Sequence, residues 1–415
     1  MALPEHIHFI GIGGAGMAPL AEILLARGVG VSGSDLESND KCRALSSKGA
    51  AVFTGHHRDH LPEKTRLAVY SSAVPEENPE RQKARELNMP QMRRGEFLAE
   101  LLKLYRRVAA VSGSHGKSTI TAMLTHILLA CGLQPGYMIG AGVNDGSSSH
   151  AGSGDDIFIT EADESDGTHK LLTPYLGIVP NADGDHAWSV GGEEALKENF
   201  RTFARRAERV ICFDTEKELF AGLDNIITFP HPPAGFEFAG HVGFMALNAF
   251  LAVEAAVIYG CDRQQAQEAA ASFKGIKRRM TVHIQRKGYL LIEDYAHHPQ
   301  EVARSLEYLR LKYPQYHLRI VFQPHRYARL EKFFSSFSAV LQKADSLFIA
   351  PVFAAWSETG KYNSAMLAEA SGGTALSGSF PEDARTVLQR PCDDKPLLVA
   401  VLGAGDIEKI IPYLS

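Results

Sequence analysis

The sequence predicts an α/β protein built on parallel β-sheets, and three observations support this fold class. Short apolar runs alternate with stretches of helical periodicity along the whole chain, as in repeated βαβ units. Two glycine-rich loops, 11–16 and 113–119, each follow an apolar run and precede a helical pattern. The chain has 415 residues, more than one hydrophobic core normally supports. We therefore expect three α/β domains, over residues 1–107, 108–285 and 286–415.

The first domain is expected to be a Rossmann-like sheet. Strands are predicted at the apolar runs 8–12, 29–34, 50–55 and 66–74, and a helix is predicted over 17–27, closed by Gly28. A basic amphipathic stretch, 93–107, then leads to the apolar run VAAV, where the second domain begins.

The second and third domains repeat the pattern. In the second, strands are predicted at 108–111, 156–160, 175–179 and 209–213, and helices at 117–131, 193–207 and 242–259. In the third, which is expected to be Rossmann-like, strands are predicted at 289–296, 317–325, 346–352 and 396–405. The helices expected there cover 299–313, 331–344 and 406–414.

Composition excludes several classes of protein. Hydrophobic residues make up 45% and charged residues 22%, and the net charge of −5 argues against non-specific binding of nucleic acid. The five cysteines are scattered without a C-x-x-C pair, which is typical of reduced thiols. The first ten residues lack a signal-peptide pattern, and no apolar run is long enough to cross a membrane. We expect a cytoplasmic protein without a membrane or nucleic-acid partner.

The N-terminal glycine loop (residues 11–16) reads GIGGAG, the G-x-G-x-x-G fingerprint of diphosphate binding. Asp35 follows at about the distance expected of the acid that completes the fingerprint. Alone, this pattern points to a nicotinamide-dependent dehydrogenase, but the glycines specify only a diphosphate.

The phosphate loop (residues 113–119) reads GSHGKST and opens an amphipathic helix. Its amides and the helix terminus are suited to hold a polyphosphate, with Lys117 neutralising β/γ oxygens and the Ser118 hydroxyl binding Mg²⁺. The Gly that opens the general form of this loop is replaced by Val111. The alternative is a Ser/Gly turn that caps a helix.

Polar side chains follow several predicted strands. Glu161 ends one strand, where the magnesium-binding acid of a phosphate-loop enzyme is expected, and His186 follows the next as a possible second ligand. In the third domain, Arg326 and Arg329 are spaced to share one face of a helical first turn and to bind one carboxylate. Solvated acidic and basic clusters are the alternative at each place.

These features together fit neither a dehydrogenase, which has no use for Lys117, nor a simple ATPase, which has no use for the first domain. An ATP-driven ligase that holds a phosphorylated substrate and adds a small one needs all three domains.

The chain resembles the Mur ligase family, most closely those members that act on UDP-N-acetylmuramate and L-alanine. Eleven motifs carry the resemblance in family order: HFIGIGGAGM, VSGSD, SSAV, MRRGEFLAELL, GSHGKST, EADESD, NADGDH, KGIKRRM, EDYAHHPQEV, FQPHRYARL and LGAGDI. The resemblance implies a UDP-sugar domain, a central ATPase domain and an amino-acid domain.

The resemblance also implies roles for particular residues. The residues implied to bind the UDP-sugar are Gly11, Gly13, Gly14, Ala15, Gly16, Asp35 and Ser71. ATP binding falls to Gly113, Ser114, His115, Gly116, Lys117, Ser118, Thr119, Asn248, Arg279 and Asp294, and Mg²⁺ binding to Ser118, Glu161 and His186. The implied catalytic residues are Lys117, His298, Arg326 and Arg329.

Two departures from the family pattern lie in the central domain. Phe244 and Met245 replace a His-Asn pair that lies near the adenine in the family, and Phe244 is a candidate to stack on that ring instead. The segment between 213 and 242 is also shorter than is usual for the family.

We expect an ATP- and Mg²⁺-dependent ligase of peptidoglycan precursor synthesis that joins L-alanine to UDP-N-acetylmuramate through an acyl phosphate, working as a monomer or weak homodimer. The alternatives are a related ligase that attaches a preformed peptide to the same sugar nucleotide, and a non-catalytic UDP-sugar-binding homologue.

Overall fold

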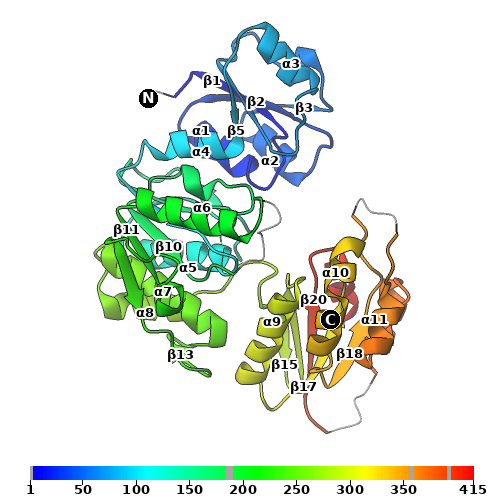
Figure 1. The fold of residues 1–415 in the computed structure, drawn as a ribbon. Coiled ribbons are helices and arrows are strands. Elements are labelled where there is room, and N and C mark those ends of the chain that lie inside the picture. The colour runs from blue at the N-terminus through cyan, green and yellow to red at the C-terminus, as the bar shows by residue number, and fades with distance from the viewer. Residues whose placement is uncertain (1–2, 145, 184–189, 356–358, 390–393) are drawn as a thin grey trace. The chain divides into compact units, whose positions relative to one another are not determined.

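The computed structural model describes residues 3–144, 146–183, 190–355, 359–389 and 394–415. The chain divides into two compact units, Met1–Pro233 with Leu247–Lys274, and Ala234–Ala246 with Gly275–Ser415 (Figure 1). The first unit contains two of the three large sheets and the second contains the third. The mixed α/β fold class is confirmed, and the boundaries at 107/108 and 285/286 stay predictions.

The first sheet has five parallel strands within the described residues, in the order β3-β2-β1-β4-β5. The strands are β1 (His6–Ile10), β2 (Gly30–Asp35), β3 (Ala51–Thr54), β4 (Leu67–Tyr70) and β5 (Gln91–Arg93). The helices are α1 (Ala18–Ala26), α2 (Asp40–Ser47), α3 (Pro79–Glu86) and α4 (Arg94–Leu102), with a 3₁₀ turn at Arg58–His60.

The two faces of this sheet are covered differently. One face is apolar: Ile7 and Phe9 pack with side chains of α1 and α4, and the Phe9 and Phe97 rings meet edge to face at 5.9 Å. The opposite face carries His8 and Ser34, which are fully buried and hydrogen-bonded to α3. A polar layer therefore lies beneath α3.

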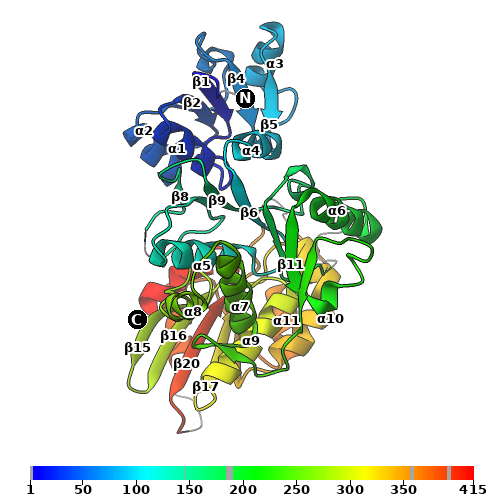
Figure 2. The ribbon, with the colours of Figure 1, turned by 90° about the vertical axis from the view of Figure 1, so that its left-hand side faces the viewer.

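The central sheet has seven strands within the described residues, in the order β12-β11-β10-β6-β9-β7-β8, and the β7–β8 pair is antiparallel. The strands are β6 (Arg107–Val111), β7 (Gly136–Met138), β8 (Ser149–His150), β9 (Ile157–Glu161), β10 (Leu176–Val179), β11 (Arg209–Phe213) and β12 (Ile226–Phe229). The helices are α5 (Lys117–Ala130), α6 (Glu193–Arg206), α7 (Gly243–Ile258) and α8 (Arg263–Ala271), with 3₁₀ turns at His169–Leu171 and Asp214–Glu216 (Figure 2).

The third sheet has six strands within the described residues, in the order β15-β16-β20-β17-β18-β19. The strands are β15 (Thr281–Arg286), β16 (Tyr289–Asp294), β17 (His317–Phe322), β18 (Ser346–Ile349), β19 (Thr374–Ala375) and β20 (Leu397–Leu402). The helices are α9 (Pro299–Lys312), α10 (Tyr327–Leu341), α11 (Ser364–Ser371) and α12 (Phe380–Val387), and a 3₁₀ helix covers Ile407–Tyr413. A small hairpin, β13 (Glu237–Phe238) and β14 (His241–Val242), precedes α7.

The sequence did not predict β15. This strand is the antiparallel edge of the third sheet, and all six of its residues are exposed or half-buried. An edge strand in this position needs few apolar residues, so its sequence lacks the pattern of a core strand. No helix in the described residues is long and apolar enough to cross a membrane.

His169 is a buried titratable group in the first unit. Its ring lies 5.1 Å from that of Phe200 and 6.1 Å from that of Phe203, and burial lowers the pKa of the imidazole from 6.5 to about 4. The unfolded chain therefore binds more protons than the folded chain between these two pH values, so the stabilisation is complete above pH 6.5 and is lost as the pH falls towards 4.

We expect the free energy of unfolding of the wild type, measured against that of His169→Leu, to fall by roughly 3 kcal/mol as the pH drops from 7 to 4. Urea unfolding at several pH values measures this difference. The exposed His57 provides a control: His57→Ala should leave the pH dependence of the wild type unchanged. A parallel pH dependence in wild type and His169→Leu would contradict the assignment.

Candidate functional site

The N-terminal glycine loop connects β1 to α1 at the carboxyl end of the first sheet. The amides of Gly11 and Ile12 donate to the Ser34 carbonyl at 2.8 and 2.9 Å, and the amide of Gly13 donates to Asp35 Oδ2 at 2.8 Å. These bonds hold the start of the loop against the end of β2. Asp35, predicted from its distance in the sequence, lies at the loop.

Close packing explains why glycine occupies this loop. A Cβ on Gly13 would lie 2.6 Å from Asn39 Nδ2 and 2.7 Å from Cys42 Sγ. Gly11 has a φ of +84°, and a Cβ there would lie 3.3 Å from that of Ser71. The structure thus brings the predicted Ser71 beside the loop as well.

Further along the loop, Gly14 and Gly16 are half-buried and Ala15 is exposed, so the loop backbone is accessible there. An accessible glycine-rich turn at the start of a helix is suited to bind a diphosphate.

Arg94, on the first turn of α4, is a site residue that the sequence did not predict. A Cβ on Gly16 would lie 2.8 Å from Arg94 Cδ, and Arg94 Nη2 donates to Asp166 Oδ2 at 2.5 Å and to Thr168 Oγ1 at 3.3 Å. Arg94 therefore links the N-terminal glycine loop to the turn that follows β9. Its only sequence signal was its place in the motif MRRGEFLAELL.

A pocket of about 130 Å³ lies beside this link. It is lined by Ser72, Arg93, Arg94, Asp166, Thr168 and Lys170, among others. Burial opposes ionisation of Asp166, but the charge of Arg94 and hydrogen bonds from Thr168 and Arg94 outweigh it, so the pKa of this carboxyl is lowered. The pocket is therefore polar and charged.

The phosphate loop connects β6 to α5 at the carboxyl end of the central sheet. Gly113 and Gly116 have φ angles of +150° and +88°, and a Cβ on either would lie 2.6 Å from another atom, respectively the Asn181 carbonyl oxygen and Asn248 Oδ1. The His115 amide donates to Asn181 Oδ1 at 2.9 Å. The predicted ATP residue Asn248 thus lies against the loop, and any larger residue at the two glycines would clash with these atoms.

Lys117 is anchored within this cradle. Its Nζ donates to the Gly113 carbonyl at 2.6 Å and to Glu164 Oε1 at 2.9 Å, and the Glu164 side chain is fully buried. Ser118 and Thr119 occupy the first turn of α5, and the hydroxyl of Ser114 donates to the Asp183 carbonyl at 2.5 Å. The pairing of Lys117 with Glu164 was not predicted.

The predicted metal ligands lie partly within the described residues. Glu161 is the last residue of β9, and its Oε1 accepts a hydrogen bond from the Gly140 amide at 2.5 Å. Ser118 is half-buried on α5, whereas His186 lies outside the described residues. A hydroxyl and a carboxylate are oxygen donors that suit Mg²⁺. In the described part of the chain, no three His, Cys, Asp or Glu side chains lie close enough together to hold a metal ion by themselves.

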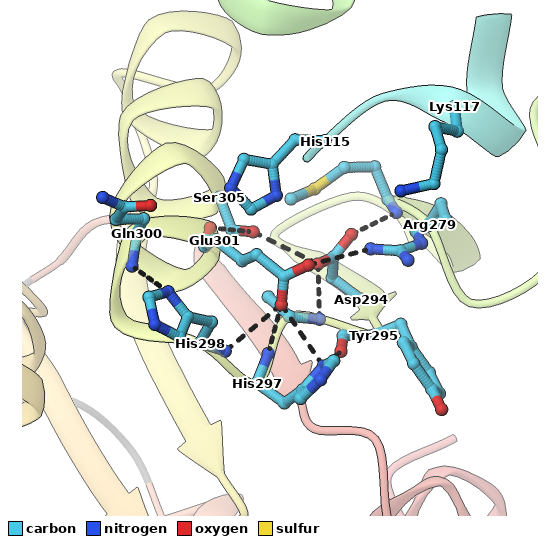
Figure 3. Close-up of polar contacts among 12 residues, drawn as sticks. His115, Lys117, Arg279, Asp294, Tyr295, His297, His298, Gln300, Glu301 and Ser305 are labelled. Carbon is cyan, nitrogen blue, oxygen red and sulfur yellow. Dashed lines mark hydrogen bonds and ion pairs between the residues drawn. The ribbon is translucent and has the colours of Figure 1, made fainter. Parts of the chain in front are cut away.

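Asp294 is a buried acid of the second unit, at the end of β16 (Figure 3). It accepts hydrogen bonds from the amides of Met280 and Ala296, at 2.9 and 2.8 Å, and from Ser305 Oγ at 3.2 Å. Burial raises the pKa of this carboxyl, against the charge of Arg279 and the two amides. The predicted residues Asp294 and Arg279 are therefore close enough for the charge of Arg279 to act on the Asp294 carboxyl.

The segment after β16 forms the start of α9 (Figure 3). Glu301 Oε2 accepts hydrogen bonds from the amides of His297 and His298, at 3.0 and 3.2 Å, and His298 Nδ1 accepts one from the Gln300 amide at 3.4 Å. The His298 ring also meets Phe333 edge to face at 4.6 Å. The predicted catalytic His298 is thus the N-cap of α9, held by local contacts.

The two predicted arginines do not share a helical turn. Arg326 precedes α10 with φ +69° and ψ 131°, and its amide donates to the Phe353 carbonyl at 2.8 Å. Arg329 lies in the first turn of α10, with its Nη1 3.4 Å from His325 Nδ1. The predicted placement of both arginines in one helical turn was wrong, because Arg326 has a positive φ and α10 begins only at Tyr327, after the bridge between His325 and Phe353.

His325 and His297 were not predicted as site residues, although both lie in polar segments that follow strands. Their rings meet edge to face at 5.6 Å. Burial lowers the pKa of His325 to about 4, helped by the charges of His297, Arg329 and Arg326, and burial also lowers the pKa of His297. Both imidazoles are therefore neutral at pH 7, next to an arginine-rich surface.

Phe244, which the sequence offered as an aromatic partner for a base, contacts Tyr308 of α9. Its ring lies 5.5 Å from that of Tyr308, at an interplanar angle of 53°. Met245 is buried.

Comparisons with known proteins identify both ends of the chain. Residues 6–106 match the family model described as the catalytic domain of the Mur ligase family, and residues 278–403 match the model described as the glutamate ligase domain of Mur ligases.

Sequence relatives cover nearly the whole chain. A UDP-N-acetylmuramate–L-alanine ligase of Aquifex aeolicus is 34% identical, with 98% of this chain and 96% of the relative aligned. The protein of the same name from an Anaeromyxobacter strain is 37% identical over 99% and 97% of the two chains.

Solved structures show the same fold. The UDP-N-acetylmuramate–alanine ligase of Thermotoga maritima superposes with a TM-score of 0.80 at 24% identity, covering 99% of this chain and 98% of that one. A murein peptide ligase of Psychrobacter arcticus gives a TM-score of 0.66 at 22% identity over the same shares.

Proposed function

The chain belongs to the Mur ligase family, and from that premise we propose that it joins L-alanine to the carboxylate of UDP-N-acetylmuramate at the expense of ATP. The observation that carries this proposal is the presence of two nucleotide cradles in one compact unit, the N-terminal glycine loop and the phosphate loop. A diphosphate cradle suits the UDP end of a sugar nucleotide, and the phosphate loop with Lys117 suits ATP.

The proposed reaction has two steps. The lactyl carboxylate of the sugar nucleotide attacks the γ-phosphorus of ATP, which forms an acyl phosphate and releases ADP. The amino group of L-alanine then attacks the acyl carbon, the C–O bond to phosphate breaks, and the amine loses a proton as the amide and inorganic phosphate form. ATP is needed because an ionised carboxylate has no good leaving group.

Residues of the first unit perform the phosphoryl transfer in this proposal. Amides of the phosphate loop bind the phosphates, and Lys117 leaves the Glu164 carboxylate to neutralise the transferred group. Ser118 and Glu161, with His186, would hold Mg²⁺, which supplies positive charge to the phosphate oxygens when bound. Asn248, packed against Gly116, supports the loop.

Residues of the second unit serve the amino acid and the rest of ATP. We assign the ribose of ATP to Asp294 with Arg279, and the carboxylates of the reactants to Arg326 and Arg329. His298 holds the start of α9 beside this surface. The neutral His297 is chemically able to accept the proton that the amine loses, whereas His325, with a pKa of about 4, is too weakly basic for that role.

We further propose that the enzyme works in the cytoplasm, in peptidoglycan precursor synthesis, as a monomer or weak homodimer. A cytoplasmic ligase has direct access to both ATP and the sugar nucleotide.

Release of inorganic phosphate tests the proposed function directly. Purified protein with ATP, Mg²⁺ and UDP-N-acetylmuramate is expected to release phosphate only when L-alanine is added. Activity with a tripeptide but not with L-alanine would favour a peptide-attaching ligase, and UDP-sugar binding without turnover on any amine would favour a non-catalytic homologue. Replacement of UDP-N-acetylmuramate by UDP-N-acetylglucosamine, which lacks the carboxylate, is the matched control and is expected to abolish release.

A further inference from the structure

A buried polar network lies beneath α3, on the opposite side of the first sheet from α1. Its centre is Glu80, whose side chain is fully buried. Glu80 Oε2 accepts hydrogen bonds from His8 Nε2 at 2.6 Å and from Ser34 Oγ at 2.8 Å, and Glu80 Oε1 lies 3.1 Å from His56 Nδ1. His8 Nδ1 in turn lies 2.8 Å from Ser32 Oγ.

The charge state of this network follows from its contacts. Burial opposes ionisation of Glu80, but the hydrogen bonds from His8, Ser34 and His56 and the charge of His8 outweigh it, so the pKa of Glu80 is lowered. An ionised carboxylate can only accept hydrogen bonds, so His8 Nε2 and Ser34 Oγ both donate to it. The network therefore contains an ionised carboxylate, Glu80, that is held by hydrogen bonds within the first sheet and α3.

Ser34 connects this network to the N-terminal glycine loop. Its hydroxyl is bound by Glu80 from one side, and its carbonyl accepts the amides of Gly11 and Ile12. The next residue, Asp35, accepts the amide of Gly13. Ser34 is therefore bound both to the buried carboxylate of Glu80, through its hydroxyl, and to the first amides of the loop, through its carbonyl.

We infer that Glu80 and Ser34 are positioning residues for the diphosphate of the sugar nucleotide, because they fix the loop that binds it. The inference rests on the proposed function for the identity of the ligand. Neither residue faces the accessible part of the loop, so each acts through the backbone of β2 and not by contact with substrate.

The position of Ser34 argues for a functional and not merely structural role. A buried charged residue and its partners seldom stabilise a fold more than apolar residues of the same size would. The opposite face of this sheet is apolar, which shows that the domain can be packed without such groups. The network ends at the strand terminus from which the loop departs, where a small displacement changes the direction of amides that bind phosphate.

Direct binding of UDP, measured by calorimetry, and steady-state kinetics with UDP-N-acetylmuramate test this inference. Ser34→Ala removes only the connecting hydroxyl, and Glu80→Gln is a second variant that retains the size of the side chain. Each is expected to raise the Kd for UDP and the KM for the sugar nucleotide about fivefold to tenfold. The kcat and the KM for ATP are expected to stay within about twofold of wild type, because the phosphate loop has no part in the network.

The matched control is Thr65→Val. Thr65 is also buried, and its hydroxyl lies 3.4 Å from Nδ1 of His6, at the end of β1 remote from the loop. This variant also loses a buried hydroxyl contact of the first sheet and is expected to bind UDP as the wild type does.

Three results would overturn the inference. They are a wild-type Kd for UDP in both Ser34→Ala and Glu80→Gln, an equal rise in Thr65→Val, or equal rises in the KM values for ATP and the sugar nucleotide. Wild-type protein that binds UDP but releases no phosphate with any amine would overturn the proposed function alone. Wild-type protein that does not bind UDP would overturn both.

Discussion

Lys117→Ala is expected to abolish amide formation, with a loss of at least about a hundredfold in kcat/KM, while the Kd for UDP stays unchanged. Lys117 lies in the phosphate loop and its Nζ is bound by Gly113 and Glu164, whereas the N-terminal glycine loop, to which we assign UDP, belongs to the first sheet. Removal of the ammonium leaves the negative charge of the transferring phosphoryl group without the positive charge that we assign to Lys117. Phosphate release and UDP calorimetry on the same preparation measure the two effects separately.

The control for this variant is Lys197→Ala. Lys197 lies on the exposed surface of α6, where its contacts are with Glu193 and Glu194, and the variant is expected to keep full activity. Weakened UDP binding in Lys117→Ala would contradict the assignment of two separate nucleotide cradles. Retained activity would contradict the role of the phosphate loop.

Removal of divalent cation is expected to stop turnover, and Glu161→Gln is expected to reduce kcat by about a hundredfold or more even at saturating ATP. Glu161 ends β9, and its carboxylate is oriented by the amide of Gly140. A glutamine retains the shape of the side chain but lacks the charge that a hard cation prefers. Phosphate release in a titration with Mg²⁺, after treatment with chelator, measures both effects.

Glu198→Gln is the matched control, because Glu198 is an exposed carboxylate on α6 paired with Arg205. It is expected to show the Mg²⁺ dependence of the wild type. Turnover by the wild type in excess chelator would contradict a metal role for Glu161, as would a Glu161→Gln variant with an unchanged Mg²⁺ titration.

Local sequence patterns predicted the parts of the site that depend on local backbone. The two glycine loops were recognisable because each needs small residues at fixed spacing between a strand and a helix. Asp35 was predicted from its distance to the first loop, and its contact with Gly13 follows from the parallel pairing of β1 with β2. The predicted helix starting near Lys117 was confirmed for the same reason.

Contacts between distant parts of the chain were not predictable in this way. Glu80 and His8 are 72 positions apart, and Lys117 and Glu164 are 47 positions apart, so no local pattern links either pair. The prediction for Arg326 was wrong because its spacing from Arg329 is that of a helix. In the structure, the neighbouring bridge between His325 and Phe353 places Arg326 just before the start of α10. Pairing of this kind depends on tertiary structure, which overrides local propensity.

The pairing of Lys117 with Glu164 makes nucleotide binding an exchange reaction. An anion that binds Lys117 in the phosphate loop must first separate its ammonium group from the buried carboxylate of Glu164. The attraction between the anion and Lys117 is therefore reduced by the free energy needed to break the Lys117–Glu164 ion pair. Because one ion pair replaces another, fewer counterions are released than at an unpaired cation, and affinity for nucleotide should depend only weakly on ionic strength. We therefore expect the loop to bind simple anions such as sulfate more weakly than nucleotide, because they lack the further phosphates that bind the loop amides.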